Sequence, residues 1–408
     1  MKKFSIAIVA LIAFLLGSIS GSISTIVVLN TPHGAQFFHI PALAQLFETP
    51  TSQHGQVTPP NTIPETKVRI AINAPLTGPI AAWSGQFPNG FLMGIEEASK
   101  ANGIDSKIFS VDVQDNAGKP PQAVSIFNKQ QIDGFDTYIS VATGPANAIA
   151  PQLDAMELPH FIAAFDPLIT KGFPNRLRVM ANSKVEAPLF IDYARKMKAK
   201  KVHVIQINMA YAEQQFSSFI EPTLKKDGIT VTRELFDLDQ RDFKTIVQKA
   251  KTKHADLIYL CGYSFHIQPL LRDLRAAGLV KRGQILSVMD FVDLVYNGTP
   301  TAELRDVIFV SPLFDIPGKV SKAAEWRKRY EERFKMKPTY VPAYAYDNAT
   351  LIVDAYAKSK KVNTQTLLGA TPFDGLNGQI QMDQDRDIIA TVTLAEIDEN
   401  GRIAELPK

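Results

Sequence analysis

Residues 255–279 read ADLIYLCGYSFHIQPLLRDLRAAGL, and this stretch decides the fold. The apolar run Leu257–Cys261 is typical of a strand that is covered on both faces by helices. Apolar residues then repeat at helical spacing up to Gly278, a residue type expected just past a helix end. A short turn carrying Tyr263 joins the strand to the helix. Because ligands of open α/β sheets bind beyond the carboxyl ends of the strands, Tyr263 is placed to contact one.

The same alternation of strand and helix patterns extends along the chain on both sides of this unit. Alternation of this kind predicts parallel sheets with right-handed crossovers, and two successive series predict two lobes. Strands are predicted at 68–74, 107–113, 137–141, 160–164, 201–207, 229–236, 257–261, 285–289 and 306–310, with helices between them. The tail differs, because helices at 321–334 and 343–358 precede two antiparallel strands at 379–382 and 388–397. Periodicity alone assigns this tail to neither lobe.

Length and composition restrict the class of protein. A chain of 408 residues is long enough for two domains, and its formal charge is only +3. Basic residues are interleaved with acids, as in 327–333, which indicates a solvated helix face and no nucleic-acid partner. The single Cys261 excludes an internal disulfide and a cysteine zinc site, and the seven histidines do not cluster. We therefore predict no metal and no cofactor.

The N-terminus indicates export. A charged start, Met1–Lys3, precedes the apolar run 4–16 and the small residues of 17–24, so residues 1–30 are predicted to be a signal peptide or a membrane anchor. Cleavage is the favoured reading, with small residues for it at Ser18 and Ser20 or at Ala42 and Ala44. Residues 31–65 are rich in Pro, Thr and Gln and are predicted to be a tether. Either way the folded part lies outside the cytoplasm, periplasmic if secreted.

Particular motifs resemble a known family. The segment 68–86, VRIAINAPLTGPIAAWSGQ, resembles the opening of the leucine/isoleucine/valine-binding proteins, in which a first strand runs into a Thr/Ser-Gly-Pro turn. Tyr263 followed by 270–279 resembles the second-lobe turn and helix of that family, and 112–123 resembles its second-strand region. The resemblance covers about residues 66–400.

This resemblance implies a type I periplasmic binding protein. Such proteins have an α/β fold of two Rossmann-like lobes with parallel sheets, joined by three crossing segments. They close on a small polar ligand and deliver it to the permease of an ABC transporter in the inner membrane, and they are not enzymes. The implied crossings lie near 180–185, 311–315 and 388, which gives lobes of 66–183 with 313–387 and of 184–312 with 388–408.

The resemblance also implies ligand contacts in each lobe. In the first lobe they fall on Trp83, Thr143 and the segment Ala164, Phe165 and Asp166. Thr143 follows a strand and precedes a helix, where a hydroxyl and free N–H groups can bind a carboxylate; the alternative is a helix cap. Trp83 lies in a loop flanked by Gly and Pro and is interpreted as a wall of the pocket.

In the second lobe the implied contacts fall on Tyr211, Tyr263 and Asp290, and Tyr346 resembles a family tyrosine near the hinge. Each of the two strand-end tyrosines has the alternative of packing on its own helix. Asp290 follows a predicted strand where the family offers an acid to the ammonium of the ligand. It can equally serve as a helix N-cap.

Asp166 departs from the family pattern, which has a neutral hydroxyl residue there. A carboxylate at that position would repel the carboxylate of an amino acid. Asp166 can instead join Asp290 in holding an ammonium, or turn away to cap 168–170. Amides, amines and basic amino acids therefore stay open as ligands.

Two rival functions follow from the same residues. An uncleaved anchor would make the chain a membrane-bound ligand sensor with the same fold. An enzyme with a nucleotide cofactor is the other rival. No Gly-x-Gly-x-x-Gly follows the first strand and no phosphate-binding Gly-x-x-x-x-Gly-Lys-Ser/Thr occurs, which argues against that enzyme.

Overall fold

The computed structural model describes residues 27–31, 34–38 and 67–407, in two compact units that divide after Ile63. In the N-terminal unit, β1 (Val27–Thr31) and β2 (Gly34–Phe38) form a two-stranded antiparallel sheet. Apart from these strands, the predicted signal peptide or anchor and the tether lie outside the described residues. Among the helices that are described, none has the length and apolar character needed to cross a membrane.

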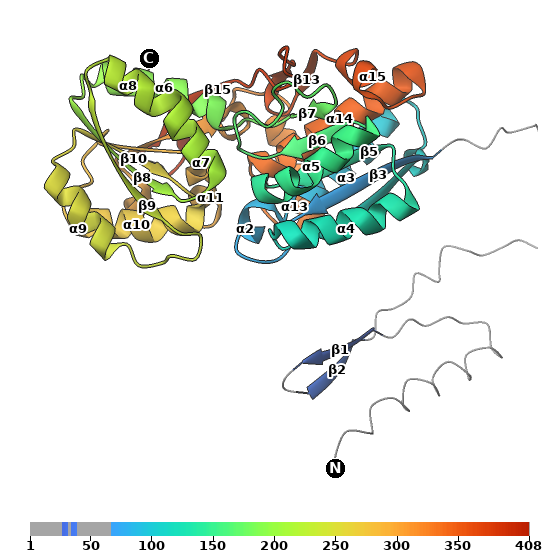
Figure 1. The fold of residues 1–408 in the computed structure, drawn as a ribbon, viewed down its shortest axis with the longest axis horizontal. Coiled ribbons are helices and arrows are strands. Elements are labelled where there is room, and N and C mark those ends of the chain that lie inside the picture. Colours follow the sequence, from blue (N-terminus) through green and yellow to red (C-terminus); the bar gives the residue numbers. More distant parts are fainter. Residues whose placement is uncertain (1–26, 32–33, 39–66, 408) are drawn as a thin grey trace, which may run out of the picture. The chain divides into compact units, whose positions relative to one another are not determined.

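The first lobe is built on a five-stranded sheet with the order β4-β3-β5-β6-β7 (Figure 1). Every neighbouring pair in it is parallel, as the alternating pattern predicts. Its central strand β5 is buried along its whole length, since helices cover both faces. The strands are β3 (Val68–Ala74), β4 (Phe109–Asp115), β5 (Thr137–Val141), β6 (His160–Ala163) and β7 (Arg176–Leu177).

The second lobe is built on a seven-stranded sheet with the order β16-β15-β12-β11-β10-β8-β9. The strands from β12 to β9 are parallel, whereas β15 and β16 are added antiparallel at one edge. The strands are β8 (Lys201–Ile207), β9 (Thr230–Phe236), β10 (Leu257–Cys261), β11 (Ile285–Ser287), β12 (Val307–Pro312), β15 (Val392–Ile397) and β16 (Ile403–Glu405).

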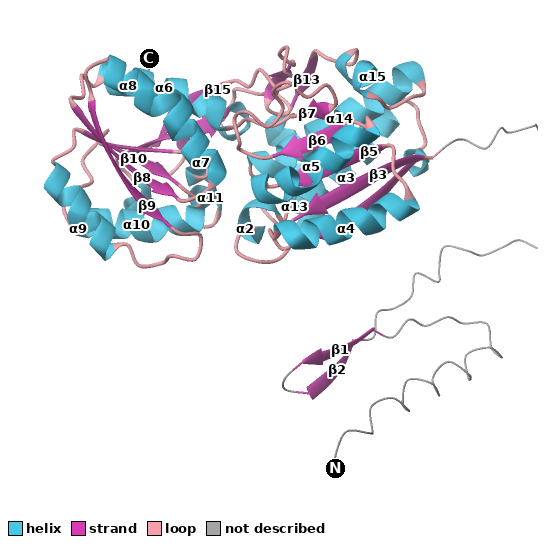
Figure 2. Ribbon diagram, viewed as in Figure 1, coloured by secondary structure: helices cyan, strands magenta, loops and turns pink. Residues whose placement is uncertain are grey.

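Helices flank both sheets (Figure 2). Those between the first-lobe strands are α2 (Ala81–Ser84), α3 (Phe87–Ala101), η2 (Ser106–Ile108), α4 (Pro120–Asp133) and α5 (Thr143–Met156). Those of the second series are α6 (Ser183–Lys196), α7 (Ala210–Gln215), the π-helical turn η3 (Phe216–Ile220), α8 (Glu221–Lys226), α9 (Lys244–Lys253), α10 (Ser264–Ala276), α11 (Phe291–Tyr296), α12 (Thr301–Leu304) and η4 (Leu313–Asp315).

The tail returns to the first lobe before it ends in the second. Helix α14 (Tyr340–Ser359) packs along α3, and α13 (Ala323–Phe334) is tied to α3 by ion pairs. Gly90 and Gly94 of α3 let the α14 backbone approach, because a Cβ at Gly90 would lie 2.0 Å from the carbonyl oxygen of Pro342. The remaining tail elements are α15 (Thr364–Leu368), β13 (Phe373–Gly375) and β14 (Gly378–Ile380).

The chain therefore passes between the two sheets three times, after β7, after β12 and before β15. This confirms the predicted fold class of two α/β lobes with three crossings. The antiparallel strands predicted at 379–382 and 388–397 correspond to the shorter β14 and β15, and one antiparallel bridge joins Met382 to Ile388. β14 pairs with β13, and β15 pairs with β12, because each finds its hydrogen-bond partner in a different lobe.

Candidate ligand-binding site between the lobes

The candidate side chains lie just past the carboxyl ends of strands. Thr143 follows β5, Phe165 follows β6, Tyr211 follows β8, Tyr263 follows β10 and Asp290 follows β11. All of them are buried. Because the strands that precede these residues are parallel within each sheet, their carboxyl ends share one edge, which gathers these residues at the facing edges of the two sheets.

Aromatic rings join the two lobes at this edge. Trp83 and Phe165 of the first lobe have ring centroids 5.2 Å apart, and Tyr211 and Tyr263 of the second lobe have centroids 6.4 Å apart. Across the lobes, Phe165 lies 5.6 Å from Tyr211 and Trp83 lies 6.2 Å from Tyr263. Each tyrosine therefore contacts the opposite lobe, and is not packed on its own helix alone.

Tyr340 also belongs to this cluster, although it is not among the site residues predicted from the sequence. Its hydroxyl accepts a hydrogen bond from Nε1 of Trp83 at 3.0 Å, and its side chain is fully buried at the start of α14. Tyr346, which was predicted, lies elsewhere: its hydroxyl donates to Glu97 at 2.9 Å, and its ring packs on Trp326. The available signal was the position of Tyr340 in the first turn of a helix, directly after a loop.

Asp290 occupies the N-cap position of α11, yet its side chain makes no capping hydrogen bond. Its Oδ1 atom has no hydrogen-bond partner, although the residue is only 2 % exposed. Burial raises the pKa of this carboxyl well above its ordinary value, and the nearby carboxyls of Asp293 and Glu186 raise it further. A buried oxygen without a partner is costly, so this atom is available to a ligand.

Thr143 is the first residue of α5, and no side-chain cap hydrogen bond occurs at this helix start. The preceding Ala142 has a φ of 77°, a left-handed value that is strained for a residue with a Cβ. Helix N-terminal N–H groups and a hydroxyl at this position form a site suited to a carboxylate.

One carboxylate oxygen of Asp166 is engaged within its own loop. Its Oδ1 accepts a hydrogen bond from the backbone N–H of Leu168 at 2.9 Å, which is the capping alternative considered from the sequence. The carbonyl oxygen of Ala164 is also engaged, since Nη1 of Arg178 donates to it at 3.0 Å. Both residues thus have protein partners before any ligand binds.

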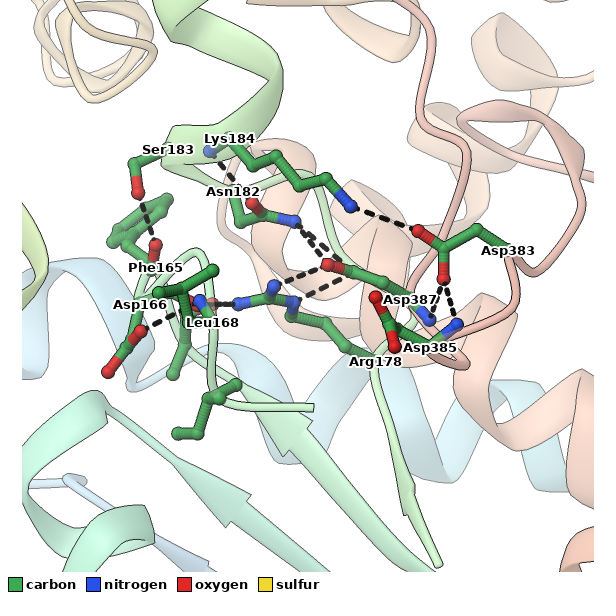
Figure 3. Close-up of polar contacts among 12 residues, drawn as sticks. Phe165, Asp166, Leu168, Arg178, Asn182, Ser183, Lys184, Asp383, Asp385 and Asp387 are labelled. Atoms are coloured by element: carbon green, nitrogen blue, oxygen red, sulfur yellow. Dashed lines mark hydrogen bonds and ion pairs between the residues drawn. The ribbon is translucent and has the colours of Figure 1, made fainter. Parts of the chain in front are cut away.

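A buried network at the crossing segments holds the loop 164–166 (Figure 3). The Arg178 guanidinium donates to both carboxylate oxygens of Asp387 and to the carbonyl oxygens of Ala164 and Asp166. Ser183 donates to the carbonyl oxygen of Phe165. Side chains of the first crossing therefore fix three consecutive carbonyls beside the aromatic cluster.

The same network ties the first crossing to the third. Asn182 caps α6 by accepting from the N–H of Lys184 and also donates to Asp387 at 3.2 Å. Lys184 pairs with Asp383 at 3.0 Å, in a more exposed setting. A change in the angle between the lobes must act on these contacts, so they couple the crossings to the candidate site.

Glu186, on α6, is a second buried acid behind the site. Its Oε1 accepts from the N–H of Met289 at 2.8 Å, and its Oε2 accepts from Gln215 at 3.2 Å. Burial raises the pKa of Glu186 to about 7, despite these two hydrogen bonds. The folded protein therefore keeps this proton at pH values where the unfolded chain has lost it.

The wild-type protein is expected to lose stability as the pH rises from 4.5 to about 7, and Glu186→Gln is expected to remove this loss. Because the folded pKa lies above the unfolded value of 4.5, the cost of ionising Glu186 is absent below pH 4.5 and grows until about pH 7. Relative to the variant, the wild type should lose about 2–3 kcal/mol of unfolding free energy over that interval. Urea denaturation of both proteins at pH 4.5, 6 and 8 measures this difference. Parallel pH profiles would contradict it.

A hollow of about 230 Å³ lies beside the aromatic cluster. Its lining includes Ala82, next to Trp83, and Ser264 and Phe265, which follow Tyr263. It thus involves both lobes. Within the described part of the chain, no group of three or more His, Cys, Asp or Glu side chains is arranged to hold a metal ion.

Residues 67–402 match the model of a family described as periplasmic binding protein. The chain belongs to the periplasmic binding protein family. The match covers both lobes and all three crossings, so the family assignment applies to the whole of the larger unit.

Among related periplasmic binding proteins, Leu/Ile/Val-binding protein homolog 3 of Brucella melitensis biotype 1 is 32% identical over 234 residues. That alignment covers 55% of this chain and 63% of the relative. A leucine-, isoleucine-, valine-, threonine- and alanine-binding protein of Pseudomonas aeruginosa is 28% identical, over 53% of this chain and 59% of the relative. The chain thus spans less than two thirds of these relatives.

Solved structures share the fold. The branched-chain amino acid transporter substrate binding protein LivJ of Streptococcus pneumoniae, in complex with isoleucine, has a TM-score of 0.71 at 23% identity, covering 83% of this chain and 97% of that one. A solute binding protein of Rhodopseudomonas palustris BisB5, in complex with 3,4-dihydroxy benzoic acid, has a TM-score of 0.73 at 20% identity, covering 84% and 97%. At these identities the likeness concerns the fold alone.

Proposed function

We propose that this chain is an extracytoplasmic solute-binding protein that closes on a small amino-acid-like ligand and delivers it to the permease of an ABC transporter. One observation carries the proposal. Aromatic rings from both lobes meet at the facing sheet edges, next to the buried Asp290 with its unpartnered oxygen. Neither lobe encloses that position alone, so binding and closure are coupled.

Each part of the candidate site has a role in this proposal. Asp290 accepts hydrogen bonds from the ligand's ammonium group, and Thr143 with the start of α5 binds its carboxylate. The rings of Trp83, Phe165, Tyr211 and Tyr263 surround the rest of the ligand. Ala164 and Asp166 act through the shape of their loop, because the Ala164 carbonyl oxygen and the Oδ1 atom of Asp166 already accept hydrogen bonds from the protein.

The proposed organisation of the chain follows the three crossings. We assign 66–183 with 313–387 to the first lobe and 184–312 with 388–408 to the second. Residues 1–30 act as signal peptide or anchor, and 31–65 act as a tether to the membrane if the anchor is retained. The family assignment supports a place outside the cytoplasm.

Asp290→Asn is expected to weaken ligand binding by ten- to a hundredfold. The substitution keeps the shape of the side chain but removes the charge from a hydrogen bond worth about 1.5–3 kcal/mol. A thermal-shift screen of the full chain against amino acids, amides and amines identifies a ligand, and calorimetry then gives the dissociation constants. The apo variant should be at least as stable as the wild type, because a buried carboxyl has been removed.

Asp166→Asn is the matched control. An asparagine Oδ1 can still accept from the N–H of Leu168, so the dissociation constant should change less than about twofold. Equal losses in both variants would remove Asp290 from its assigned role. Failure of every solute in the screen to shift the melting temperature would remove the proposed function itself.

A further inference from the structure

The rings between the lobes form a closed circuit. Going round it, the centroid distances are 5.2 Å from Trp83 to Phe165, 5.6 Å to Tyr211, 6.4 Å to Tyr263 and 6.2 Å back to Trp83. Each ring is tilted or edge-on to its neighbours, with interplanar angles between 42° and 61°. In this closed series each ring has one neighbour in its own lobe and one in the opposite lobe.

A group at the centre of such a circuit contacts every ring. Four centroids at these spacings, arranged as a square, put the centre about 4 Å from each of them, which is inside the ~6 Å range of cation–π attraction. Tryptophan and tyrosine have the most favourable ring faces for a cation, and they supply three of the four rings. Since two rings come from each lobe, the enclosure exists only when the lobes are closed.

Asp290 is a buried acid beside the circuit, and it makes no ion pair with any described residue. Asp290 follows β11, which pairs in parallel with β10, and Tyr263 follows β10, so the two residues lie at the same edge of the sheet. The charged groups that act on Asp290 are themselves carboxyls, Asp293 and Glu186. Its Oδ1 has no partner. A cation next to these acids would lower the cost of burying a carboxylate there.

Three kinds of ligand group fit this environment unequally. A neutral branched alkyl group fills a ring of aromatics but leaves the buried Asp290 oxygen uncompensated. A bare ammonium satisfies Asp290, yet it is strongly hydrated and presents no alkyl surface to the rings. An ammonium that carries methyl or other alkyl groups offers apolar surface to all four rings and positive charge to the acid at once.

We propose that the rings of Trp83, Phe165, Tyr211 and Tyr263 form a cage for an alkylated ammonium group of the solute, with Asp290 as its counter-ion. This inference rests on the proposed function, which it narrows from amino-acid-like ligands to those with an N-alkylated cationic end. The amino-acid carboxylate, where present, keeps its place at Thr143.

Pairs of probes that differ only in charge test the cage. Glycine betaine is compared with tert-butylacetate, its carbon analogue, and choline with its neutral tert-butyl analogue; leucine is the reference amino acid. Calorimetry with the full chain should give a dissociation constant at least about tenfold lower for the charged member of a pair, and lower than that of leucine.

Ring substitutions separate a cage from a merely apolar wall. Tyr263→Leu keeps apolar volume but removes one ring, so it should weaken the charged probe about tenfold and change the neutral one little. Phe265→Leu is the control, because the Phe265 ring stacks on Tyr263 at 5.5 Å outside the circuit. It should affect both members of a pair equally.

The outcomes are distinct. Tighter binding of a charged probe, lost selectively in Tyr263→Leu, supports the cage. Leucine or a neutral analogue binding as tightly as the charged probes would overturn it and leave the solute-binding function standing. If no probe and no amino acid binds, the cage and the proposed function both fail.

Discussion

Arg178→Met should destabilise the protein by about 3–5 kcal/mol, because it leaves the carboxylate of Asp387 buried without its counter-ion. The Arg178 side chain is fully buried and Asp387 nearly so. The substitution also removes the hydrogen-bond donor to the carbonyl oxygens of Ala164 and Asp166. Leaving these buried oxygens without a donor adds to the loss of stability. Denaturant unfolding of the single variant measures the loss.

Two further variants make this prediction specific. Arg178→Met combined with Asp387→Leu replaces the pair by apolar groups and should recover part of the loss, but not the part that belongs to the two carbonyls. Lys184→Met breaks the more exposed pair with Asp383, and should cost less than about 1 kcal/mol. If Arg178→Met costs no more than Lys184→Met, the buried network does not stabilise the hinge.

Gly90→Ala is the second substitution with a large expected effect, a loss of about 3 kcal/mol or more. Its new Cβ would lie 2.0 Å from the carbonyl oxygen and 2.7 Å from the carbonyl carbon of Pro342. These are backbone atoms of α14, which cannot rotate away, so the whole helix must shift. Helix propensity alone predicts the opposite sign, because alanine is favoured over glycine by about 1 kcal/mol.

Gly144→Ala provides the matched control for that substitution. Gly144 is also helical, and the nearest atom to a Cβ there is the Pro120 side chain at 3.3 Å. We expect little change or a small gain in stability for this variant, measured by the same denaturant unfolding. A loss at Gly144 equal to that at Gly90 would show that close approach of α14 to α3 is not the cause.

Local periodicity was sufficient for most of the fold. The predicted strands at 68–74, 137–141, 201–207 and 257–261 coincide with β3, β5, β8 and β10, because each is rich in apolar residues and is buried along nearly its whole length in a parallel sheet. Local periodicity does not predict the short strands β7, β13 and β16. Each has only two or three residues, which is too short for an alternation of apolar and polar residues to be recognised. These strands are defined by their hydrogen-bond partners in the folded protein.

The candidate site was predictable only in part. A strand that ends before a helix is visible in the sequence, and this placed Thr143, Tyr211, Tyr263 and Asp290 at the facing edges. The direction of a side chain is not visible in this way. Asp166 and Asp290 both follow strands. The side chain of Asp166 accepts a hydrogen bond from the backbone N–H of Leu168, whereas the side chain of Asp290 makes no capping hydrogen bond to α11.

The sequence by itself determined the two series of alternating strands and helices and the positions where strands end before helices, since these depend on neighbours within a few residues. The three crossings were implied only by the family resemblance. Tertiary structure alone decided that Tyr340 and not Tyr346 meets Trp83, and that Arg178 pairs with Asp387. Those partners are 257 and 209 residues apart in the chain, and no local pattern encodes a contact over such a separation. They come together only when the tail packs on the first lobe and crosses back.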